Sequence, residues 1–438
     1  MDPSLVLNRR RWLLGAAGAG AMASLAAPAA QAARLKTQAR IVIAGSGLGG
    51  LAVATRLTHM LEGARITIID KKQEHNYQPG YTLVATGVWP VGKVRDRNAD
   101  LQPAGVEWIQ DMVAEFDPAG NAVRTAAGQR VPYDYLVVAT GTHQDWGLIE
   151  GMDVTAIGQN GLASVYPSPE AAQATWHAMD AFRRKGGNAL MTLPATPLKC
   201  AGAPLKMTFM LRDRLAQAGT LDQSTVTFYS ALGSVFGVKP VNDNVVARWK
   251  DLGIGIETTQ KLKAVDIEAR KATFVTPEGV ASDVAYDFIH VVPPMRAPDA
   301  VKNSDLAWKE GNFAAGGWLE VDKDTLQHRR YKNVFGIGDI NGTPRGKTAA
   351  TVKKSAPIVA QHVVDVIAGR EPGQKFDGYT SCPLIVREGA AMLIEFDYEG
   401  RLVPSLPMIE PLQESYFAWL MKYAMLKPAY MAVLKGRV

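Results

Sequence analysis

The fold of this chain is decided by the stretch RIVIAGSGLGG at residues 40–50 and by ITIID at residues 66–70. The apolar start of the first stretch is typical of a buried parallel strand. Gly45, Gly47 and Gly50 follow it in the GxGxxG spacing that opens a helix against a pyrophosphate. The second stretch ends at Asp70, 20 residues after Gly50, where a carboxylate can accept hydrogen bonds from an adenosine ribose. Because strand, glycines, helix and acid occur together, they predict a bound dinucleotide and not an ordinary strand-turn-helix.

Length and composition are those of a globular protein with two or three domains. The chain has 438 residues, of which 47% are hydrophobic and 21% are charged. Its formal net charge is +6, and removal of residues 1–32 would lower it to +4. This charge balance does not favour a nucleic acid as partner, and we expect none.

The N-terminus, residues 1–32, is predicted to be a twin-arginine export signal. Three arginines, Arg9 to Arg11, precede a weakly apolar run rich in glycine and alanine, which ends at a small-residue site around Ala30. The run is too short and too glycine-rich for a convincing membrane span. The twin-arginine route carries folded proteins, which suits an enzyme that acquires its cofactor in the cytoplasm. The alternative is an uncleaved tail.

A second α/β unit is predicted over residues 151–284, with a strand at 189–193, a helix at about 203–218 and a strand at 225–229. The first turn of this unit reads LPATPLKCAGAP at residues 193–204. A pyridine-nucleotide reductase would carry its second GxGxxG here. The three prolines and the missing glycines obstruct the approach of a pyrophosphate. Cys200 therefore stands where a nicotinamide cofactor would bind.

The chain is then predicted to return to the first domain over residues 285–370. A strand at 286–292 comes first, and a strand at 333–339 ends at Asp339, shortly before a helix that starts near Thr348. We expect Asp339 to bind the ribityl hydroxyls of a flavin; the alternative is a helix-capping aspartate. An earlier apolar strand closes with Ala-Thr-Gly at residues 139–141, which is typical of flavoproteins with two dinucleotide domains.

The two cysteines, Cys200 and Cys382, are 182 residues apart. In an exported protein they would form one structural disulfide, worth roughly 4 to 5 kcal/mol in the loop-entropy model. Their surroundings favour a redox role of the two cysteines as strongly as a structural disulfide. Cys200 lies between Lys199 and Lys206 and precedes a helix whose dipole favours a thiolate. Two thiols at one flavin face can alternate between disulfide and dithiol.

Taken together, these residues resemble the sulfide:quinone oxidoreductases of the two-cysteine type, which includes the mitochondrial enzyme. The resemblance runs from about residue 38 to about residue 425. It is carried by HNYQP at residues 75–79, PLKCAGAP at 197–204, TLQHRRY at 325–331, GIGD at 336–339 and FDGYTSCPL at 376–384.

The resemblance implies an α/β fold of two Rossmann-like domains, the FAD fold of the disulfide reductases, with an amphipathic helical tail that binds the membrane. The FAD domain is expected over residues 38–150 and 285–370, the Cys200 domain over 151–284, and a C-terminal region with Cys382 over 371–438. The cofactor-binding residues are expected to be Gly45, Gly47, Gly49, Gly50, Asp70, Lys71, Gln78, Thr140, Gly141, Gly338, Asp339 and Lys347.

The resemblance also assigns catalytic roles to Cys200, Cys382 and Lys347. Sulfide attacks the bridged cysteine pair, which leaves one cysteine as a persulfide and the other as a thiolate beside the flavin. We expect the attack at Cys200 and the thiolate at Cys382. Lys347 would stabilise the reduced, anionic ring by its charge; the alternative is a solvated surface lysine. Three-cysteine members have a further cysteine near residues 164–166, and this chain has none there.

The C-terminal tail is predicted to lie in the membrane interface, where a quinone resides. After Pro411 it is rich in aromatic and basic residues, namely Tyr416, Phe417, Trp419, Lys422, Tyr423, Lys427, Tyr430, Lys435 and Arg437. Pro428 is expected to divide it into two helical pieces, each too short to span a bilayer. The alternative is a helix pair packed on the protein itself or on another subunit.

The predicted function is FAD-dependent oxidation of sulfide to sulfane sulfur with a membrane quinone as electron acceptor. We expect a peripheral protein on the periplasmic side of the bacterial inner membrane. The sulfur acceptor is undetermined, and the oligomeric state is open, a homo-oligomer included. We predict no metal site, because none of the seven histidines pairs with a cysteine at the spacing of metal ligands.

Three alternatives stay open at this point. The flavin subunit of a flavocytochrome c sulfide dehydrogenase would share the fold and the cysteines but pass electrons to a haem subunit. An NADH:quinone oxidoreductase is disfavoured by the missing second GxGxxG. A flavin-containing sulfur carrier or sensor would have no working acceptor site.

Overall fold

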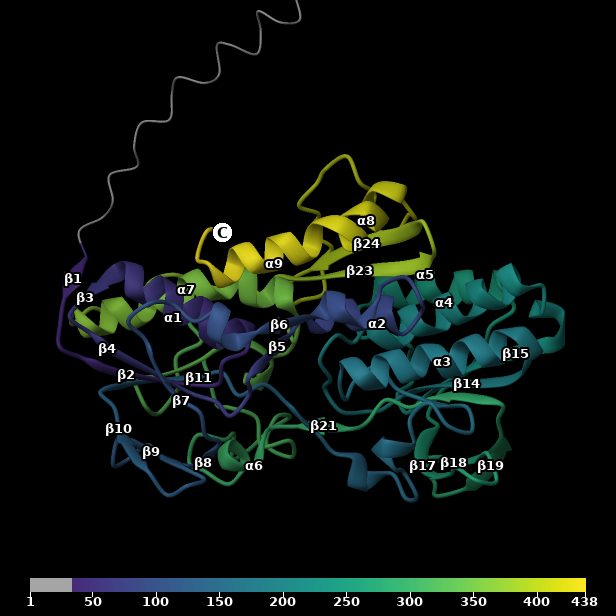
Figure 1. Cartoon of the computed structure of the whole chain (residues 1–438), viewed down its shortest axis with the longest axis horizontal. Coiled ribbons are helices and arrows are strands. Elements are labelled where there is room, and N and C mark those ends of the chain that lie inside the picture. Colours follow the sequence, from purple (N-terminus) through teal and green to yellow (C-terminus); the bar gives the residue numbers. More distant parts are fainter. Residues whose placement is uncertain (1–33) are drawn as a thin grey trace, which may run out of the picture.

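A computed structural model of the chain describes residues 34–438, so the predicted export signal lies outside the described residues. Its first sheet has five parallel strands in the order β22-β11-β2-β4-β7 (Figure 1). They are β2 (Arg40–Ala44), β4 (Arg65–Ile69), β7 (Glu107–Ile109), β11 (Tyr135–Val138) and β22 (Val334–Gly336). Two long helices, α1 (Leu48–Met60) and α7 (Ala349–Ile367), lie side by side over one face. The predicted order of strand, glycine turn, helix and strand ending at Asp70 is confirmed.

The second sheet also has five parallel strands, in the order β13-β20-β14-β15-β16. They are β13 (Leu162–Ala163), β14 (Gly187–Leu193), β15 (Ser224–Ser230), β16 (Gly255–Glu257) and β20 (Phe288–His290). Its helices are α3 (Pro169–Lys185), α4 (Ala203–Ala218) and α5 (Lys239–Asp251). The helix predicted at residues 203–218 is confirmed as α4.

One strand was assigned to the wrong domain. We predicted that the strand at residues 286–292 belongs to the returning first domain, whereas β20 lies inside the second sheet between β13 and β14. An apolar strand fits either sheet, because both are buried on their two faces and their strands have the same apolar pattern. The chain crosses back only at β21 (Met295–Arg296), which pairs with β12 (His143–Gln144) between the two lobes (Figure 1).

Two antiparallel sheets and several short elements complete the two lobes. The antiparallel sheets are β8 (Val113–Asp117), β9 (Ala122–Thr125) and β10 (Arg130–Pro132), and β17 (Lys261–Asp266), β18 (Lys271–Val275) and β19 (Ala281–Ala285). The short strands and helices are β1 (Leu35–Lys36), β3 (Leu61–Glu62), β5 (Glu74–Asn76), β6 (Arg95–Arg97), α2 (Tyr81–Val84) and α6 (Asp299–Lys302). Single 3₁₀ turns lie at Gln78–Gly80, Val91–Val94, Asn98–Asp100, Trp146–Leu148, Val154–Ala156, Leu221–Gln223 and Gly338–Ile340.

The C-terminal region lies across the top of both lobes in Figure 1. It consists of the hairpin β23 (Thr380–Arg387) and β24 (Ala390–Phe396), followed by α8 (Tyr416–Leu420), a π-helical turn (Met421–Met425) and α9 (Leu426–Leu434). α8 packs on β24, and α9 packs on α1 and α7. In the described part of the chain, no helix is long and apolar enough to cross a membrane.

The tail is divided before Pro428 and not at it. The irregular turn lies at Met421–Met425, and Pro428 is the third residue of α9, which continues directly from that turn. A proline has no N–H and its ring clashes with the carbonyl group four residues earlier, here Ala424, so its disturbance falls on the turn before it.

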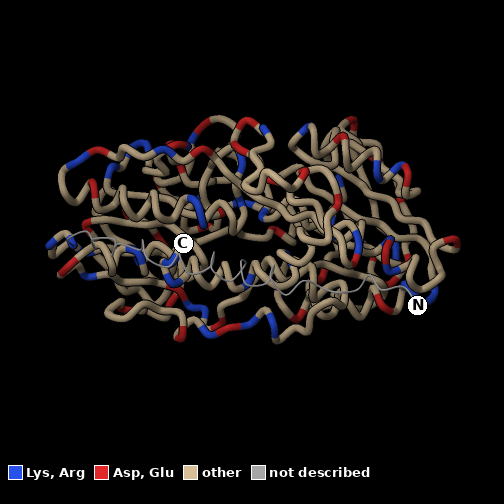
Figure 2. Tube along the Cα trace, turned by 90° about the horizontal axis from the view of Figure 1, so that it is seen from above, with Lys and Arg blue, Asp and Glu red and all other residues tan. Residues whose placement is uncertain are grey.

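Charged residues of both signs are interspersed over the molecule (Figure 2). Neither lobe carries a broad field of one sign in that view. The functional site must therefore be located from buried side chains and not from the surface charge.

Candidate functional site

The glycine turn between β2 and α1 leaves room for a phosphate at the N-terminus of α1. Gly45 has φ +114°, which favours glycine, and a Cβ atom there would collide with the carbonyl oxygen of Ala139. A Cβ atom on Gly50 would collide with the carbonyl oxygen of Gly45. Gly47 precedes the first helical residue and has open space where its Cβ atom would be. Gly45 and Gly50 therefore shape the turn, and Gly47 faces the place where a pyrophosphate would bind.

Asp70 lies beside this turn, as predicted for a residue that binds ribose. Its carboxylate accepts hydrogen bonds from the amide and hydroxyl of Ser46, at 2.7 and 2.9 Å, and from the amide of Lys72 at 2.9 Å. Lys71, the next residue, has an exposed side chain. Gly49 has a packing role as well, because its Cβ position lies 3.0 Å from Ile337, just after β22; its predicted contact with the cofactor stays a prediction. It allows α1 to pack closely on the sheet.

The loop after β11, next to the glycine turn, carries a polar atom without a hydrogen-bond partner. The hydroxyl of Thr140, just after β11, is buried and has no hydrogen-bond partner. Gly141 follows it with φ +69° and open space around its Cβ position. Buried polar atoms are nearly always paired, so the Thr140 hydroxyl marks a place that a bound polar group would fill. The cradle between Gly47, Asp70 and Thr140 fits a dinucleotide.

Asp339 lies in a 3₁₀ turn that starts at Gly338, after β22. It does not cap α7, because α7 begins at Ala349 and its cap is Thr348, whose hydroxyl accepts a hydrogen bond from the amide of Thr351. Burial raises the pKa of the Asp339 carboxyl, and the charges of Lys347 and Lys199 oppose that rise. The helix-capping alternative for Asp339 is therefore wrong, and Asp339 is a half-buried acid that follows a parallel strand.

Lys347 is not a solvated surface lysine. Its ammonium group donates to the carbonyl oxygens of Asp339 and Asn341, at 2.6 and 2.9 Å, and lies 3.6 Å from the ring centre of Trp318. Burial lowers the pKa of Lys347 to about 7, against the effect of the Asp339 charge. The carbonyl oxygen of Lys347 accepts a hydrogen bond from the amide of Cys200 at 2.9 Å. Lys347 thus connects the Asp339 turn with the cysteine loop.

Gln78 joins the cysteine loop from another direction. Its side-chain oxygen accepts a hydrogen bond from the ammonium group of Lys199 at 2.7 Å. Burial lowers the pKa of Lys199 to about 8. The HNYQP segment and the Cys200 loop, which are far apart in sequence, therefore meet at the site.

The two cysteines come together as free thiols. Cys200 is half-buried in the loop before α4 and has φ +51°, in the left-handed region. Cys382 is buried on β23. The Cys382 sulfur lies so close to Gly202 that a Cβ atom there would collide with it. Each cysteine shifts the pKa of the other, so the two thiols are near neighbours.

The charges around the pair favour a thiolate at Cys200. Interaction with Cys382 is the largest cause that holds the pKa of Cys200 well below its usual value, followed by the charges of Lys206 and Lys422. Interaction with Cys200 and burial raise the pKa of Cys382 well above its usual value. These directions describe the free dithiol; the expected order, with sulfide attack at Cys200 and the thiolate at Cys382, stays a prediction.

Two buried lysines face the sulfur atoms. The ammonium group of Lys206, on α4, lies 3.6 Å from the Cys200 sulfur. Burial would lower the pKa of Lys206, but the charges of both cysteines raise it. Lys422 donates to the carbonyl oxygen of Pro79, and burial lowers its pKa to about 7. Lys206 provides positive charge where a thiolate or persulfide anion would form, and Lys422 adds to it in its protonated form.

Sequence reasoning missed the role of Lys422 and of Tyr166. Lys422 was assigned to the membrane-facing basic residues of the tail, whereas its side chain is buried, donates to the carbonyl oxygen of Pro79 and interacts with the charges of both cysteines. The spacing of the tail carries no signal of this contact. Tyr166 lies in the segment where other members have a cysteine, and its hydroxyl is 3.4 Å from the carbonyl oxygen of Cys200.

The tail is also fastened to the glycine turn by a chain of buried hydrogen bonds. The hydroxyl of Tyr430 lies 2.6 Å from Nε2 of His75, whose Nδ1 lies 3.0 Å from the side-chain oxygen of Asn98. The side-chain nitrogen Nδ2 of Asn98 donates to the hydroxyl of Ser46 at 2.8 Å. Burial lowers the pKa of His75 and so favours the neutral ring. One face of the tail therefore packs on the protein, as the alternative for this segment supposed.

The comparisons with known proteins agree with this geometry. Residues 39–181 match the family described as pyridine nucleotide-disulphide oxidoreductase. The mitochondrial sulfide:quinone oxidoreductase of Mus musculus is 35% identical over 401 residues, which cover 90% of this chain and 86% of that protein. The mitochondrial sulfide:quinone oxidoreductase of Dictyostelium discoideum is 36% identical over 406 residues, which cover 92% and 88%.

Among solved structures, the sulfide:quinone oxidoreductase from Aquifex aeolicus aligns with a TM-score of 0.76 at 22% identity, over 91% of this chain and 92% of that one. At this identity the likeness shows the fold alone, and it confirms the predicted α/β fold of the disulfide reductases. The cofactor of this fold is FAD, which suits the open cradle. The flavocytochrome alternative gains no support from these relatives.

The predicted export to a bacterial periplasm also gains no support, because both relatives are named as mitochondrial. The enzyme class, in contrast, is confirmed. Identity above 30% over nine-tenths of the chain shows that this flavoprotein oxidoreductase belongs to the sulfide:quinone oxidoreductase family.

Proposed function

We propose that this chain oxidises sulfide to sulfane sulfur at Cys200 and Cys382 and delivers the two electrons to a membrane quinone. The observation that carries the proposal is the meeting of the two free thiols beside two buried lysines, Lys206 and Lys422. FAD, when bound, supplies an acceptor for two electrons and passes them on to the quinone. The cradle residues Gly47, Asp70 and Thr140 would hold the cofactor, together with the remaining predicted glycines, Lys71, Gln78 and Asp339.

In the proposed reaction, sulfide attacks a disulfide between the two cysteines. One S–S bond breaks, a new S–S bond forms between sulfide and one cysteine, and the electron pair of the broken bond stays on the other cysteine as a thiolate. Thiols of lower pKa leave faster. Because the surroundings favour the thiolate at Cys200, we propose attack at Cys382 and release of the Cys200 thiolate, the reverse of the order predicted from the sequence.

Lys206 and Lys422 would stabilise the anions of this step, and Lys347 would hold positive charge at the cofactor. Lys206 contacts the Cys200 sulfur, so it is placed to stabilise the leaving thiolate. Lys347 is fixed by two carbonyl oxygens and the Trp318 ring, so its ammonium group keeps one position. The acceptor of the sulfane sulfur is not identified.

Anaerobic mixing of the FAD-loaded protein with sulfide tests the proposal. Sulfide should bleach the flavin absorbance, and a short-chain quinone should restore it. Cys200→Ser and Cys382→Ser should each abolish the bleaching and retain bound FAD. Full bleaching in both variants, or bleaching by NADH and not by sulfide, would overturn the proposed function.

We further propose that the outer face of the tail lies on the membrane, where the quinone is collected. Large apolar side chains are exposed along one side of α8 and the π-helical turn, namely Tyr416, Phe417, Leu420, Tyr423 and Met425. Tyr423 and Trp89 also line an open groove of about 360 Å³ with Lys93 at its rim. Deletion of the tail is a poor test, because Lys422 and Tyr430 belong to the site and the core.

A substitution on the exposed face tests membrane binding without these losses. Phe417→Glu should release the protein from vesicles of phosphatidylethanolamine and phosphatidylglycerol in a sedimentation assay. Leu148→Glu is the matched control, since Leu148 is at least as exposed as Phe417 but lies outside the tail, in the turn Trp146–Leu148. Equal release by both variants, or by neither, would reject this face as the membrane contact.

Export by the twin-arginine route is a separate proposal that rests on residues 1–32 alone. Fractionation of bacterial cells that express the full chain tests it. Replacement of Arg9, Arg10 and Arg11 by lysine should retain the protein in the cytoplasm. An unchanged distribution would reject export.

A further inference from the structure

The helix that follows Cys200 and the strand that carries Cys382 run side by side in the same direction. α4 and β23 are in contact along their length. Near its start, α4 meets the Cys382 sulfur at Gly202, and near its end it meets Glu388, the residue after β23. Twelve residues of helix rise about 18 Å, and six residues of strand rise about 20 Å. The two elements therefore span the same length between a cysteine end and a distal end.

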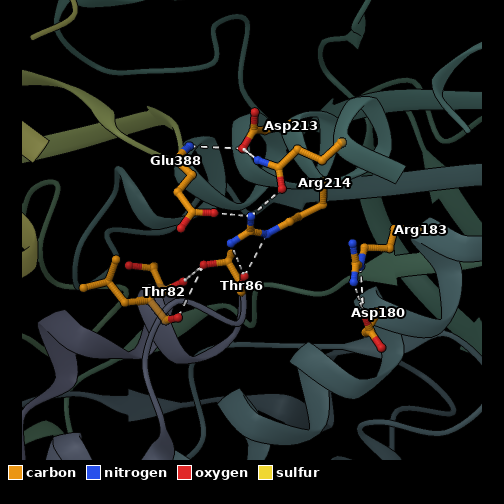
Figure 3. Close-up of polar contacts among 9 residues, drawn as sticks. Thr82, Thr86, Asp180, Arg183, Asp213, Arg214 and Glu388 are labelled. Carbon is orange, nitrogen blue, oxygen red and sulfur yellow. Dashed lines mark hydrogen bonds and ion pairs between the residues drawn. The ribbon is translucent and has the colours of Figure 1, made fainter. Parts of the chain in front are cut away.

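The distal end is held by two neighbouring residues of α4 (Figure 3). The Asp213 carboxylate accepts a hydrogen bond from the backbone amide of Glu388 at 3.0 Å. The Arg214 guanidinium forms an ion pair with the Glu388 carboxylate. Backbone and side chain of one hairpin residue are thus both bound by the helix, and we refer to Asp213, Arg214 and Glu388 as the clamp.

Arg214 also fixes the clamp to the first domain. Its guanidinium donates twice to the carbonyl oxygen of Thr86, just after α2, at 3.0 and 2.8 Å (Figure 3). The Arg214 side chain is only 7% exposed, whereas that of Glu388 is 45% exposed. Removal of one partner of a buried guanidinium is destabilising, because it leaves a buried charge uncompensated. The contacts of Arg214 should therefore be retained. One side chain therefore joins α4, the hairpin and the segment that follows Gln78.

Packing on helices holds the hairpin in place. β23 and β24 form a sheet of two strands, and they contact α4, α7 and α8. A two-stranded hairpin needs such packing to be stable, and a disulfide needs its two Cα atoms within a narrow range of distances. Of these helices, α4 is the one that follows Cys200, so the packing of β23 on α4 sets the position of Cys382 relative to Cys200.

We propose that Asp213, Arg214 and Glu388 are positioning residues that hold Cys382 against the Cys200 loop and so favour the disulfide over the dithiol. The inference rests on the proposed function, because it assumes that the cysteine pair is redox-active. The clamp touches neither sulfur. It keeps the Cys382 thiol close to the Cys200 thiol, which raises the effective concentration of each thiol at the other.

Equilibration of the FAD-loaded protein with glutathione buffers tests this proposal. The protein dithiol and one glutathione disulfide give the protein disulfide and two glutathione molecules, so two electrons and two protons are exchanged. Glu388→Ala should lower this equilibrium constant about tenfold, which corresponds to a potential about 30 mV less negative. Glu388→Gln, which still accepts a hydrogen bond from Arg214, should recover most of the loss.

Arg387→Ala is the matched control, because Arg387 lies in the same turn but pairs with Glu414 outside α4. It should leave the constant unchanged, and the melting temperature of each variant is measured in parallel. An unchanged constant in Glu388→Ala, or an equal drop in Arg387→Ala, would overturn the proposal. If the unaltered protein forms no Cys200–Cys382 disulfide in any buffer, the proposed function fails instead.

Discussion

The two strand-turn-helix units that begin the two sheets have the same architecture and hold different chemistry. In the first, Gly47 leaves the N-terminus of α1 open. In the second, Cys200 lies in the turn, and the sulfur of Cys382 lies against Gly202 at the N-terminus of α4. A helix N-terminus stabilises negative charge in either case, a pyrophosphate in one and a thiolate in the other. The few residues of the turn decide which anion is bound.

The largest effect is expected from Gly50→Ala in the first turn. The new Cβ atom would collide with the carbonyl oxygen of Gly45, and neither backbone can move away without opening the turn. We expect a loss of about 3 kcal/mol in the free energy of unfolding, measured by urea denaturation, together with loss of FAD. Gly47→Ala is the control, since it meets no atom; it should keep the stability and weaken only FAD binding. Equal stability of the two variants would contradict this account of the turn.

In the second turn, Gly202→Ala should separate sulfur chemistry from cofactor binding. The backbone of Gly202, with φ −82°, accepts alanine, but its methyl group would collide with the Cys382 sulfur. A displacement of about 1 Å costs roughly 100-fold in rate. We therefore expect flavin reduction by sulfide to slow about 100-fold with FAD fully bound, as measured by stopped-flow absorbance. A normal rate would show that the sulfur position is adjustable.

A smaller effect is expected from Lys206→Met, which removes the cation at the Cys200 sulfur. A positive neighbour favours the thiolate, so its loss should raise the pKa of Cys200 and move alkylation of the dithiol to higher pH. Lys422→Met should cause a smaller rise, because Lys422 makes no hydrogen bond to the sulfur and its own lowered pKa, about 7, leaves it partly neutral at pH 7. The pH dependence of iodoacetamide labelling measures both. Equal midpoints in all three proteins would contradict the proposed role of the lysines.

The smallest effect is expected where the tail touches the first turn. Tyr430→Phe removes the hydroxyl that lies 2.6 Å from His75 and leaves a buried ring nitrogen without its partner. We expect a loss of about 1 to 2 kcal/mol in unfolding free energy. Tyr423→Phe is the control, because Tyr423 is partly exposed on the outer face. A loss of equal size in the control would assign the effect to the tail in general.

Local sequence was sufficient for the first turn and insufficient for the second site. The stretch from Gly45 to Asp70 was predicted correctly because its strands, glycines and helix are neighbours along the chain. Helix 203–218 was predicted for the same reason. The meeting of Cys382 with Gly202 depends on packing of β23 on α4 and has no local signal; only the family resemblance indicated it. The burial of Lys422 and the placement of β20 likewise result from contacts between distant segments.

The contacts of α9 with α1 also have a kinetic consequence. The hydroxyl of Thr55 donates to the carbonyl oxygen of Leu434, 379 positions away in the chain, and the Arg56 guanidinium donates to that of Val433. During synthesis the chain emerges from its N-terminus, so α1 exists long before the segment that covers it. Contacts between such distant residues form slowly, because their loop-closure entropy is lost before any contact is gained. The first domain to be synthesised is therefore among the last to be complete, and its nucleotide cradle stays partly uncovered until α9 has docked.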